Sequence, residues 1–389
     1  MEFIGALRWF GNRDLIALEE IYQGGAREVV TALHAKTTGS VWEMDEISAL
    51  QARIHGTGLG WSVVESLPVH EEIKKGSPGR DQWIDNYIAS LQNLAACGIR
   101  VVCYNFMPLL DWVRTDLAYP VGRHRDALAF DWIRLALFDV FILQRKGAAD
   151  AYPAPWIHEA EAQFTAMDEP TREALIHTLL KGTQHFVNGP MGELATADLV
   201  TGFQDLLDTY QGIGADGLKD NYRYFLDRVV PAASEAGIFL AVHPDDPPFP
   251  IFGLPRILST TADYDWLSGV HPSVHNGITF CTGSLGSRAD NDLEAFVEKF
   301  AERIHFLHLR FTQLTDRGFF EDEHLSRPAT LKHICQVLGE QRNKSIVFRP
   351  DHGHRILSDF NAAYHPGYPL WGRLKGLYEL EAFMQACRL

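Results

Sequence analysis

Eight short runs rich in Val, Ile, Phe and Leu recur along this chain of 389 residues, and most are followed by a longer amphipathic stretch with helical spacing. Such runs are typical of strands buried on both faces, and their alternation with helices indicates a parallel sheet. Eight parallel strands are the number that closes into a barrel. The sequence therefore predicts an α/β fold, a single (β/α)8 TIM barrel over residues 1–389, with strands at 3–8, 28–34, 60–65, 100–105, 238–243, 278–281, 305–308 and 345–351.

Two segments interrupt the alternation. Residues 109–217 show helical but not β patterning, at 126–144, 171–186 and 195–210. We expect them to form a helical insertion after the fourth strand, on the C-terminal rim of the barrel; a separate domain is the alternative. Residues 244–277 are rich in proline, which predicts a long ordered loop around a short helix.

Composition limits the partners and the compartment. The chain has 35 Lys and Arg against 50 Asp and Glu, and a net charge of -15 would repel a nucleic-acid backbone. No apolar run reaches the roughly 18–20 residues of a membrane span, and no basic region precedes a hydrophobic stretch at the N-terminus. Five scattered cysteines suit a reducing compartment. We therefore expect a soluble cytoplasmic enzyme that binds neither nucleic acid nor membrane.

Polar side chains stand at the ends of the predicted strands, where the chemistry of such barrels takes place. They are Arg8, His34, Glu65, Tyr104 with Asn105, His243, Cys281, His308, and Asp351 with His352.

The last four strands each end in a side chain that can bind a metal, and barrel closure would bring those ends together. Two imidazoles, a thiolate and a carboxylate suit Zn, Fe or Mn better than Mg or Ca; the residues are His243, His308, Cys281 and Asp351. A coincidence of buried polar residues is the alternative. Cys281 could also be a nucleophile, but the Thr-Gly-Ser that follows it supplies no general base.

The segment 349–354, which reads RPDHGH, is the densest group of reactive side chains. Pro350 cannot donate to a strand ladder, so the strand ends there. If Asp351 binds a metal, His352 leaves the strand in another direction and is free for proton transfer. Tyr368 follows on the next loop, where a packing role is the alternative, since a phenol acts as a base near neutral pH only if cations lower its pKa.

Several multi-residue motifs together resemble mannonate dehydratases of the UxuA type. They are FIGALRWFG at 3–11, TALH at 31–34, VW at 41–42, ESLPVH at 65–70, YNFMP at 104–108, DW at 111–112 and RPDHG at 349–353. The resemblance runs from end to end. It implies a barrel related to xylose isomerases, a divalent metal (Mn²⁺ first, Fe²⁺ second) and no nucleotide cofactor. The reaction implied is conversion of D-mannonate to 2-keto-3-deoxy-D-gluconate with loss of water, in hexuronate (glucuronate) catabolism.

The resemblance also implies roles for individual residues. The metal ligands would be His243, Cys281, His308 and Asp351, and the catalytic pair His352 and Tyr368. We expect sugar contacts from Arg8, His34, Trp42, Tyr104 and Asn105, and a bidentate contact between Arg310 and the substrate carboxylate.

The chemistry needs one base at C2 and one acid at the C3 hydroxyl. We prefer Tyr368 as the base, activated by Arg310 or Arg373, and His352 as the acid. The alternatives are a metal-dependent sugar isomerase or epimerase, which the thiolate of Cys281 disfavours, and a non-catalytic sugar-acid sensor. We also expect a homodimer.

Overall fold

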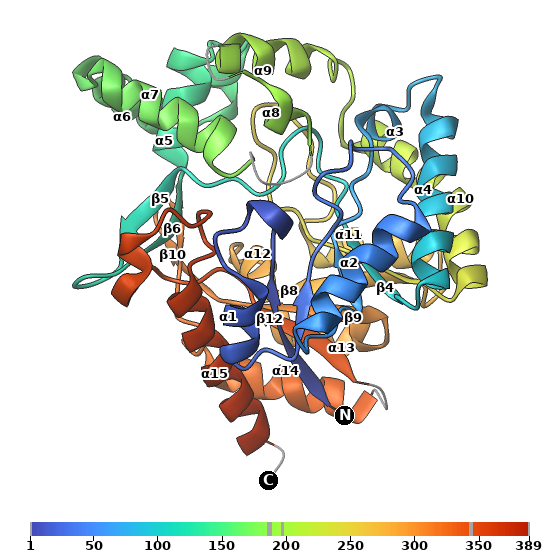
Figure 1. Cartoon of the computed structure of the whole chain (residues 1–389). Helices are drawn as coiled ribbons and strands as arrows, with labels where there is room; N and C mark the ends of the chain where they lie inside the picture. The colour runs from blue at the N-terminus through green and yellow to red at the C-terminus, as the bar shows by residue number, and fades with distance from the viewer. Residues whose placement is uncertain (1, 185–188, 196–197, 342–344, 388–389) are drawn as a thin grey trace.

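Eight parallel strands form the centre of the structure, a computed structural model that describes residues 2–184, 189–195, 198–341 and 345–387 (Figure 1). The strand order is β2-β1-β12-β9-β8-β7-β4-β3. The two ends of this sheet meet through isolated parallel bridges, Glu28 with Gly60 and Thr31 with Val64. The sheet therefore closes on itself, and the predicted (β/α)8 barrel is confirmed.

All eight predicted strands are present. They are β1 (Phe3–Arg8), β2 (Glu28–Val30), β3 (Val63–Glu65), β4 (Val101–Tyr104), β7 (Phe239–Val242), β8 (Asn276–Cys281), β9 (Ile304–Leu309) and β12 (Ile346–Pro350). β2 and β3 are shorter than predicted, with three residues each.

Side chains fill the interior of the barrel. One buried cluster takes a single residue from each of seven strands, namely Ala6, Val30, Val63, Cys103, Ala241, Phe306 and Val347. Because the interior is packed, a ligand can approach only at the ends of the strands.

Helices surround the barrel (Figure 1). They are α1 (Leu18–Gln23), α2 (Met44–Gly56), α3 (Glu71–Lys75), α4 (Arg80–Ala96), α10 (Ala215–Ala236), α11 (Thr261–Val270), α12 (Thr282–Gly286), α13 (Leu293–Phe300), α14 (Pro328–Gln341) and α15 (Leu370–Ala386). In α10 the buried residues Leu218, Tyr222, Phe225, Val229 and Ala233 recur every three or four positions, as an amphipathic helix requires. α10 ends at Gly237, whose φ of 70° is the left-handed conformation favoured by glycine.

Residues 109–217 lie above the barrel, on the side away from the two termini (Figure 1). They contain β5 (Asp116–Pro120), β6 (Asp126–Asp131), α5 (Trp132–Ala136), α6 (Ala154–Ala166), α7 (Glu169–His177), α8 (Pro190–Glu193) and α9 (Leu199–Asp208). A second buried apolar cluster joins this segment, through Phe138 and Phe203, to Phe252 and Phe319 from other parts of the chain.

The prediction that this segment has no β character is wrong. The first predicted helix of this segment, 126–144, begins instead with the strand β6. The helix α5 starts after it, where the Asp131 side chain caps the helix by accepting from the backbone N–H groups of Ile133 and Arg134. β6 pairs with β11 (Gly318–Glu321) of a hairpin formed with β10 (Thr312–Thr315), in an antiparallel sheet of order β10-β11-β6-β5. β6 and β11 are far apart in the sequence, and whether a segment forms a strand depends on what it packs against. The local pattern of residues therefore did not indicate this strand.

The other two predicted helices of the segment correspond to α7 and α9, while residues 185–186 and 196–197 of those predictions lie outside the described residues. The proline-rich stretch 244–277 contains a single helix, α11, as predicted. Among the described residues, no helix combines the length and the apolar character needed to cross a membrane.

Candidate metal centre and active site

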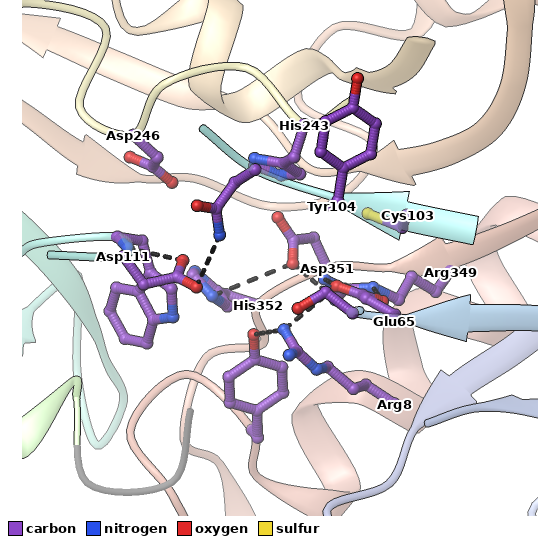
Figure 2. A pocket seen from close by; sticks show the side chains of 14 residues that line it. Arg8, Glu65, Cys103, Tyr104, Asp111, His243, Asp246, Arg349, Asp351 and His352 are labelled. Carbon is purple, nitrogen blue, oxygen red and sulfur yellow. Dashed lines mark hydrogen bonds and ion pairs between the residues drawn. The ribbon is translucent and has the colours of Figure 1, made fainter. Parts of the chain in front are cut away.

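A cavity opens at the carboxyl ends of the barrel strands (Figure 2). The predicted site residues that line it are Arg8, Tyr104, Asn105, His243, Asp351, His352 and Tyr368. Charged residues without a predicted role, Glu65, Asp111, Asp246 and Arg349, also line it, together with Ser66, Cys103 and Trp112.

The four predicted metal ligands lie together. They stand at or near the ends of β7, β8, β9 and β12, which are neighbours in the barrel, and the strand register places Cys281 opposite His308. Ligand atoms of His243, Cys281 and His308 all lie within 4.8 Å of one another. The fourth residue joins them, because Cys281 Sγ is 3.6 Å from Asp351 Oδ2.

The two imidazole rings turn acceptor nitrogens toward each other. His243 Nδ1 lies 2.7 Å from the Pro244 carbonyl oxygen, which can only accept, so in the neutral ring the proton is on Nδ1 and not on Nε2. His308 Nδ1 lies 3.4 Å from Arg349 Nη2, which can only donate. His243 Nε2 and His308 Nδ1 are 3.0 Å apart.

Two facing lone pairs repel unless a proton or a cation lies between them. Two nitrogens bound at about 2.1 Å to one ion stand roughly 3.0–3.4 Å apart, which matches the observed separation. The donor set of these residues therefore fits a divalent cation of the Mn, Fe or Zn type.

Hydrogen bonds and ion pairs also hold the other two candidate ligands, Cys281 and Asp351, in place. Cys281 Sγ accepts from Ser284 at two atoms, the backbone N at 3.3 Å and Oγ at 3.1 Å, and it lies 3.6 Å from Asp351 Oδ2. Asp351 binds Arg349 Nη1 and Arg310 Nε, both at 2.5 Å. Burial alone would raise the pKa of Asp351, but the neighbouring positive charges, Arg349 foremost, hold it well below its usual range.

His352 is oriented by a carboxylate. Its Nδ1 lies 2.8 Å and 3.0 Å from the two carboxylate oxygens of Glu321, the last residue of β11. Nδ1 therefore donates to Glu321, and the other ring nitrogen, Nε2, is 3.9 Å from Asp351 Oδ1, beside the candidate metal site.

Tyr368 reaches the cavity from a tight turn before α15. Gly367 in that turn has a φ of 81°, and a Cβ there would lie 2.9 Å from His352 Cδ2, so only glycine allows this approach. Arg8 Nη1 donates to the Tyr368 hydroxyl at 3.3 Å. Burial raises the pKa of Tyr368 to about 12, although the charges of Arg8 and Arg349 act in the opposite direction.

These facts correct two expectations about Tyr368. The arginine on its hydroxyl is Arg8, whereas Arg373 Nε and Nη1 donate to the backbone carbonyls of Pro369 and Arg8. A phenol whose pKa is raised to about 12 keeps its proton near neutral pH, so the activation that the base role requires is not seen in these contacts.

Arg310 does not have the predicted role. Its three nitrogens bind Asp351, Glu321 and Asp246 at 2.5, 3.0 and 2.6 Å, and it is buried outside the cavity lining. A guanidinium with all three nitrogens on protein carboxylates has no free fork for the substrate, so we withdraw that contact.

Arg310 belongs to a buried network that the sequence did not reveal. Arg114 binds Asp246 through two nitrogens, at 2.6 and 3.0 Å, and Glu321 through two, at 3.0 and 2.8 Å. The network thus joins residue 114, in the segment above the barrel, to the ligand Asp351.

Three other predicted sugar contacts differ from expectation. Trp42 is buried against α4, where its backbone N binds Ser90 Oγ at 3.0 Å, and it is not part of the cavity lining. His34 Nε2 faces Thr31 Oγ1 at 3.4 Å and the Trp9 carbonyl oxygen at 3.3 Å, also outside the lining. Burial and the charge of Arg8 lower the pKa of His34 to about 3, so its ring is neutral.

The third is Tyr104, whose hydroxyl points away from the cavity (Figure 2) and lies 2.8 Å from the Tyr222 hydroxyl. Arg8 and Asn105 do line the cavity, as expected.

Some functional groups that we missed had a signal in the sequence. Glu65 ends its strand, and Arg349 opens the RPDHG motif; the two form a bidentate pair at 2.9 and 2.8 Å. Asp246 follows His243 closely. Glu321 had no such signal, because its place depends on the β10–β11 hairpin and its pairing with β6.

A closed (β/α)8 barrel with a polar cavity at the carboxyl ends of its strands belongs to the class of TIM-barrel proteins that carry their functional site on that face. The family model described as D-mannonate dehydratase (UxuA) matches residues 2–388. The chain therefore belongs to the D-mannonate dehydratase (UxuA) family of enzymes.

Individual relatives agree with the family model. The chain is 46% identical over 390 residues to a mannonate dehydratase of Chromohalobacter salexigens, covering 98% of both chains. It is 43% identical to a mannonate dehydratase of Marinomonas sp., covering 96% of both. The crystal structure of mannonate dehydratase from Streptococcus suis serotype 2 superposes with a TM-score of 0.75 at 32% identity, covering 99% of this chain and 93% of that one.

Proposed function

We propose that this chain catalyses the metal-dependent dehydration of D-mannonate to 2-keto-3-deoxy-D-gluconate. The observation that carries the proposal is the convergence of two imidazoles, a cysteine sulfur and a carboxylate beside His352 and Tyr368, in a member of the D-mannonate dehydratase family. The resident cation is expected to be Mn²⁺, with Fe²⁺ as the second choice.

The residues that would hold the ion are His243, Cys281, His308 and Asp351. A bound divalent cation would supply Lewis-acid stabilisation of the second negative charge that develops when C2, which adjoins a carboxylate, loses its proton.

His352 acts as the base in this proposal. Its Nδ1 donates to Glu321, which leaves the Nε2 lone pair to take the proton from C2. Tyr368 gives its phenolic proton to the departing C3 hydroxyl, which leaves as water, and the pKa raised to about 12 keeps that proton in place until then. The resulting enol tautomerises to the 2-keto product. This assignment reverses the one that we preferred from the sequence.

Substrate binding falls to residues that line the cavity and still have hydrogen-bonding capacity. Arg8 Nε is buried and has no hydrogen-bond partner among the residues that the structure describes, so Arg8 replaces Arg310 as the proposed contact of the substrate carboxylate. Asn105 and Asp111, which bind each other at 3.1 Å, are placed to contact sugar hydroxyls.

The test is metal analysis combined with turnover on D-mannonate, D-altronate and D-gluconate after Mn²⁺, Fe²⁺ or Zn²⁺ is added back to stripped protein. Formation of a 2-keto-3-deoxy acid from D-mannonate supports the proposal. Conversion of an aldose to a ketose instead would show a sugar isomerase, and binding without any product would show a sensor.

A place in hexuronate catabolism follows from this reaction, because its product is a keto acid ready for further breakdown. We also expect a cytoplasmic homodimer. No disulfide joins the five cysteines, all of which the structure describes, and this suits a reducing compartment. Light scattering of the purified protein tests the dimer.

A further inference from the structure

The Glu321 carboxylate accepts from two arginines and from His352. Oε1 accepts from Arg114 and from Arg310 Nη1, at distances from 2.8 to 3.0 Å. Oε2 accepts only from His352 Nδ1, at 3.0 Å, in the part of the chain that the structure describes, while Oε1 lies 2.8 Å from the same nitrogen. Both oxygens thus face the histidine, and Oε1 also anchors the carboxylate to the two arginines.

We propose that Glu321 is a positioning residue that fixes His352 in the Nδ1–H form and directs the Nε2 lone pair toward the reacting carbon. The inference rests on the proposed function, because it assigns Glu321 a part in the same proton transfer. A carboxylate can only accept, so the imidazole nitrogen that faces it must carry the proton. Nε2 of the neutral ring is then free to receive one.

Burial and strand pairing restrict the orientation of the Glu321 carboxylate. Glu321 is 3% exposed and ends β11, which pairs with β10 on one side and with β6 on the other. Burial alone would raise the pKa of Glu321, but the neighbouring positive charges, Arg310 foremost, lower it to about 2, so it is an anion near neutral pH.

Replacement by the isosteric amide separates positioning from packing. In Glu321→Gln the arginines, which can only donate, require the amide oxygen at the Oε1 position. The amide NH₂ then stands at the Oε2 position, 3.0 Å from His352 Nδ1, where two N–H groups would face each other. This repulsion favours a shift of the ring proton to Nε2, although the amide oxygen stays 2.8 Å from Nδ1. Nε2 can no longer act as a base, although shape and volume are unchanged.

Two measurements test this. The ¹⁵N spectrum of the histidine rings, taken on the full chain loaded with diamagnetic Zn²⁺ and assigned with His352→Asn, should show Nδ1–H in the unsubstituted protein and Nε2–H in Glu321→Gln. With the preferred metal, kcat for D-mannonate should fall about 10²–10⁴-fold in Glu321→Gln, with KM and metal content changed by less than about threefold.

The matched control is Glu323→Gln, two residues further along, where a carboxylate also binds cations but lies outside the cavity lining. It should keep both kcat and the His352 tautomer. An Nε2–H tautomer in the unsubstituted protein overturns the inference even if Glu321→Gln does not fold. Loss of metal, or a rise in KM at constant kcat, would show a structural role only. If the unsubstituted protein does not dehydrate D-mannonate, the proposed function fails instead, and the tautomer measurement still decides the role of Glu321.

Discussion

His243 Nε2 and His308 Nδ1 face each other at 3.0 Å, and the neighbours of each ring, the Pro244 carbonyl oxygen and Arg349 Nη2, leave both nitrogens as acceptors. The pair can therefore share a proton or a divalent cation between these two nitrogens.

This relationship predicts the effect of removing one ligand. His308→Ala should lower metal content from near one ion per chain to near zero and abolish turnover. The expected cause is loss of one of four donors, which no water in this buried position replaces well. Elemental analysis after gel filtration measures it. His333→Ala, a change of a more exposed histidine that pairs with Glu298, is the control and should keep the metal.

The proton-transfer roles predict opposite behaviour of two variants. Tyr368→Phe should retain exchange of the C2 hydrogen in deuterated water while losing dehydration about 10²–10⁴-fold, because only the acid is missing. His352→Asn should lose both. NMR of recovered D-mannonate detects the exchange. Exchange that survives in His352→Asn but not in Tyr368→Phe would restore Tyr368 as the base.

The buried arginine network predicts a large stability difference between two arginines. Arg310→Met leaves buried carboxylates short of a partner and should lower the free energy of unfolding by about 3–5 kcal/mol. Arg317→Met breaks an exposed pair with Glu159 and should cost only about 0–1 kcal/mol. Urea denaturation of both at one metal concentration makes the comparison. If both variants lost the same free energy of unfolding, the buried network would not contribute the stability expected of it.

His324 predicts a pH dependence of stability. Burial, first, and nearby positive charge lower its pKa from 6.5 to about 4 in the folded protein. The unfolded chain therefore binds more protons between these values, so the contribution of this group is complete above about pH 6.5 and is lost as the pH falls toward 4. His324→Gln should flatten the dependence of urea stability on pH in that window, by at most ~3 kcal/mol, whereas the same change at the exposed His55 should not.

Two cavity residues predict a contrast in substrate binding. Tyr104→Phe removes a hydroxyl that binds Tyr222, so KM should stay within about twofold and stability should fall by about 1 kcal/mol. Asn105→Ala removes a polar group in the cavity and should raise KM about tenfold, since a hydrogen bond in binding is worth roughly 1–1.5 kcal/mol. Steady-state kinetics on D-mannonate compare them, and a larger KM effect from Tyr104→Phe would reverse our reading of the cavity.

The barrel and the grouping of the candidate metal ligands could be predicted because both depend on local patterns. A strand buried on both faces shows itself as an apolar run, and a residue that follows such a run lies at the rim, as His243 and Asp351 do. Closure of the barrel is then enough to bring the candidate ligands together.

The partners of these residues could not be predicted in the same way. Arg310 follows a ligand strand, and that position made it resemble a substrate contact, but the carboxylates that occupy it come from three other segments. Glu321 was missed for a related reason: its position depends on the pairing of β11 with β6, and the pattern of residues 126–131 was taken for helix. Trp42 was expected at the site from a motif, yet its neighbours are on α4.

The antiparallel sheet that β6 shares with β11 has a consequence for how this architecture can vary. The β10–β11 hairpin follows β9 and pairs with β6 of residues 109–217, the segment that we call the cap. The same hairpin carries Glu321, the carboxylate that orients His352. The cap therefore cannot be exchanged between homologues independently of the barrel. A graft of residues 109–217 from a distant homologue would succeed only together with its own β10–β11 ribbon, and deletion of the cap should leave a chain that still binds a cation but has a misdirected histidine.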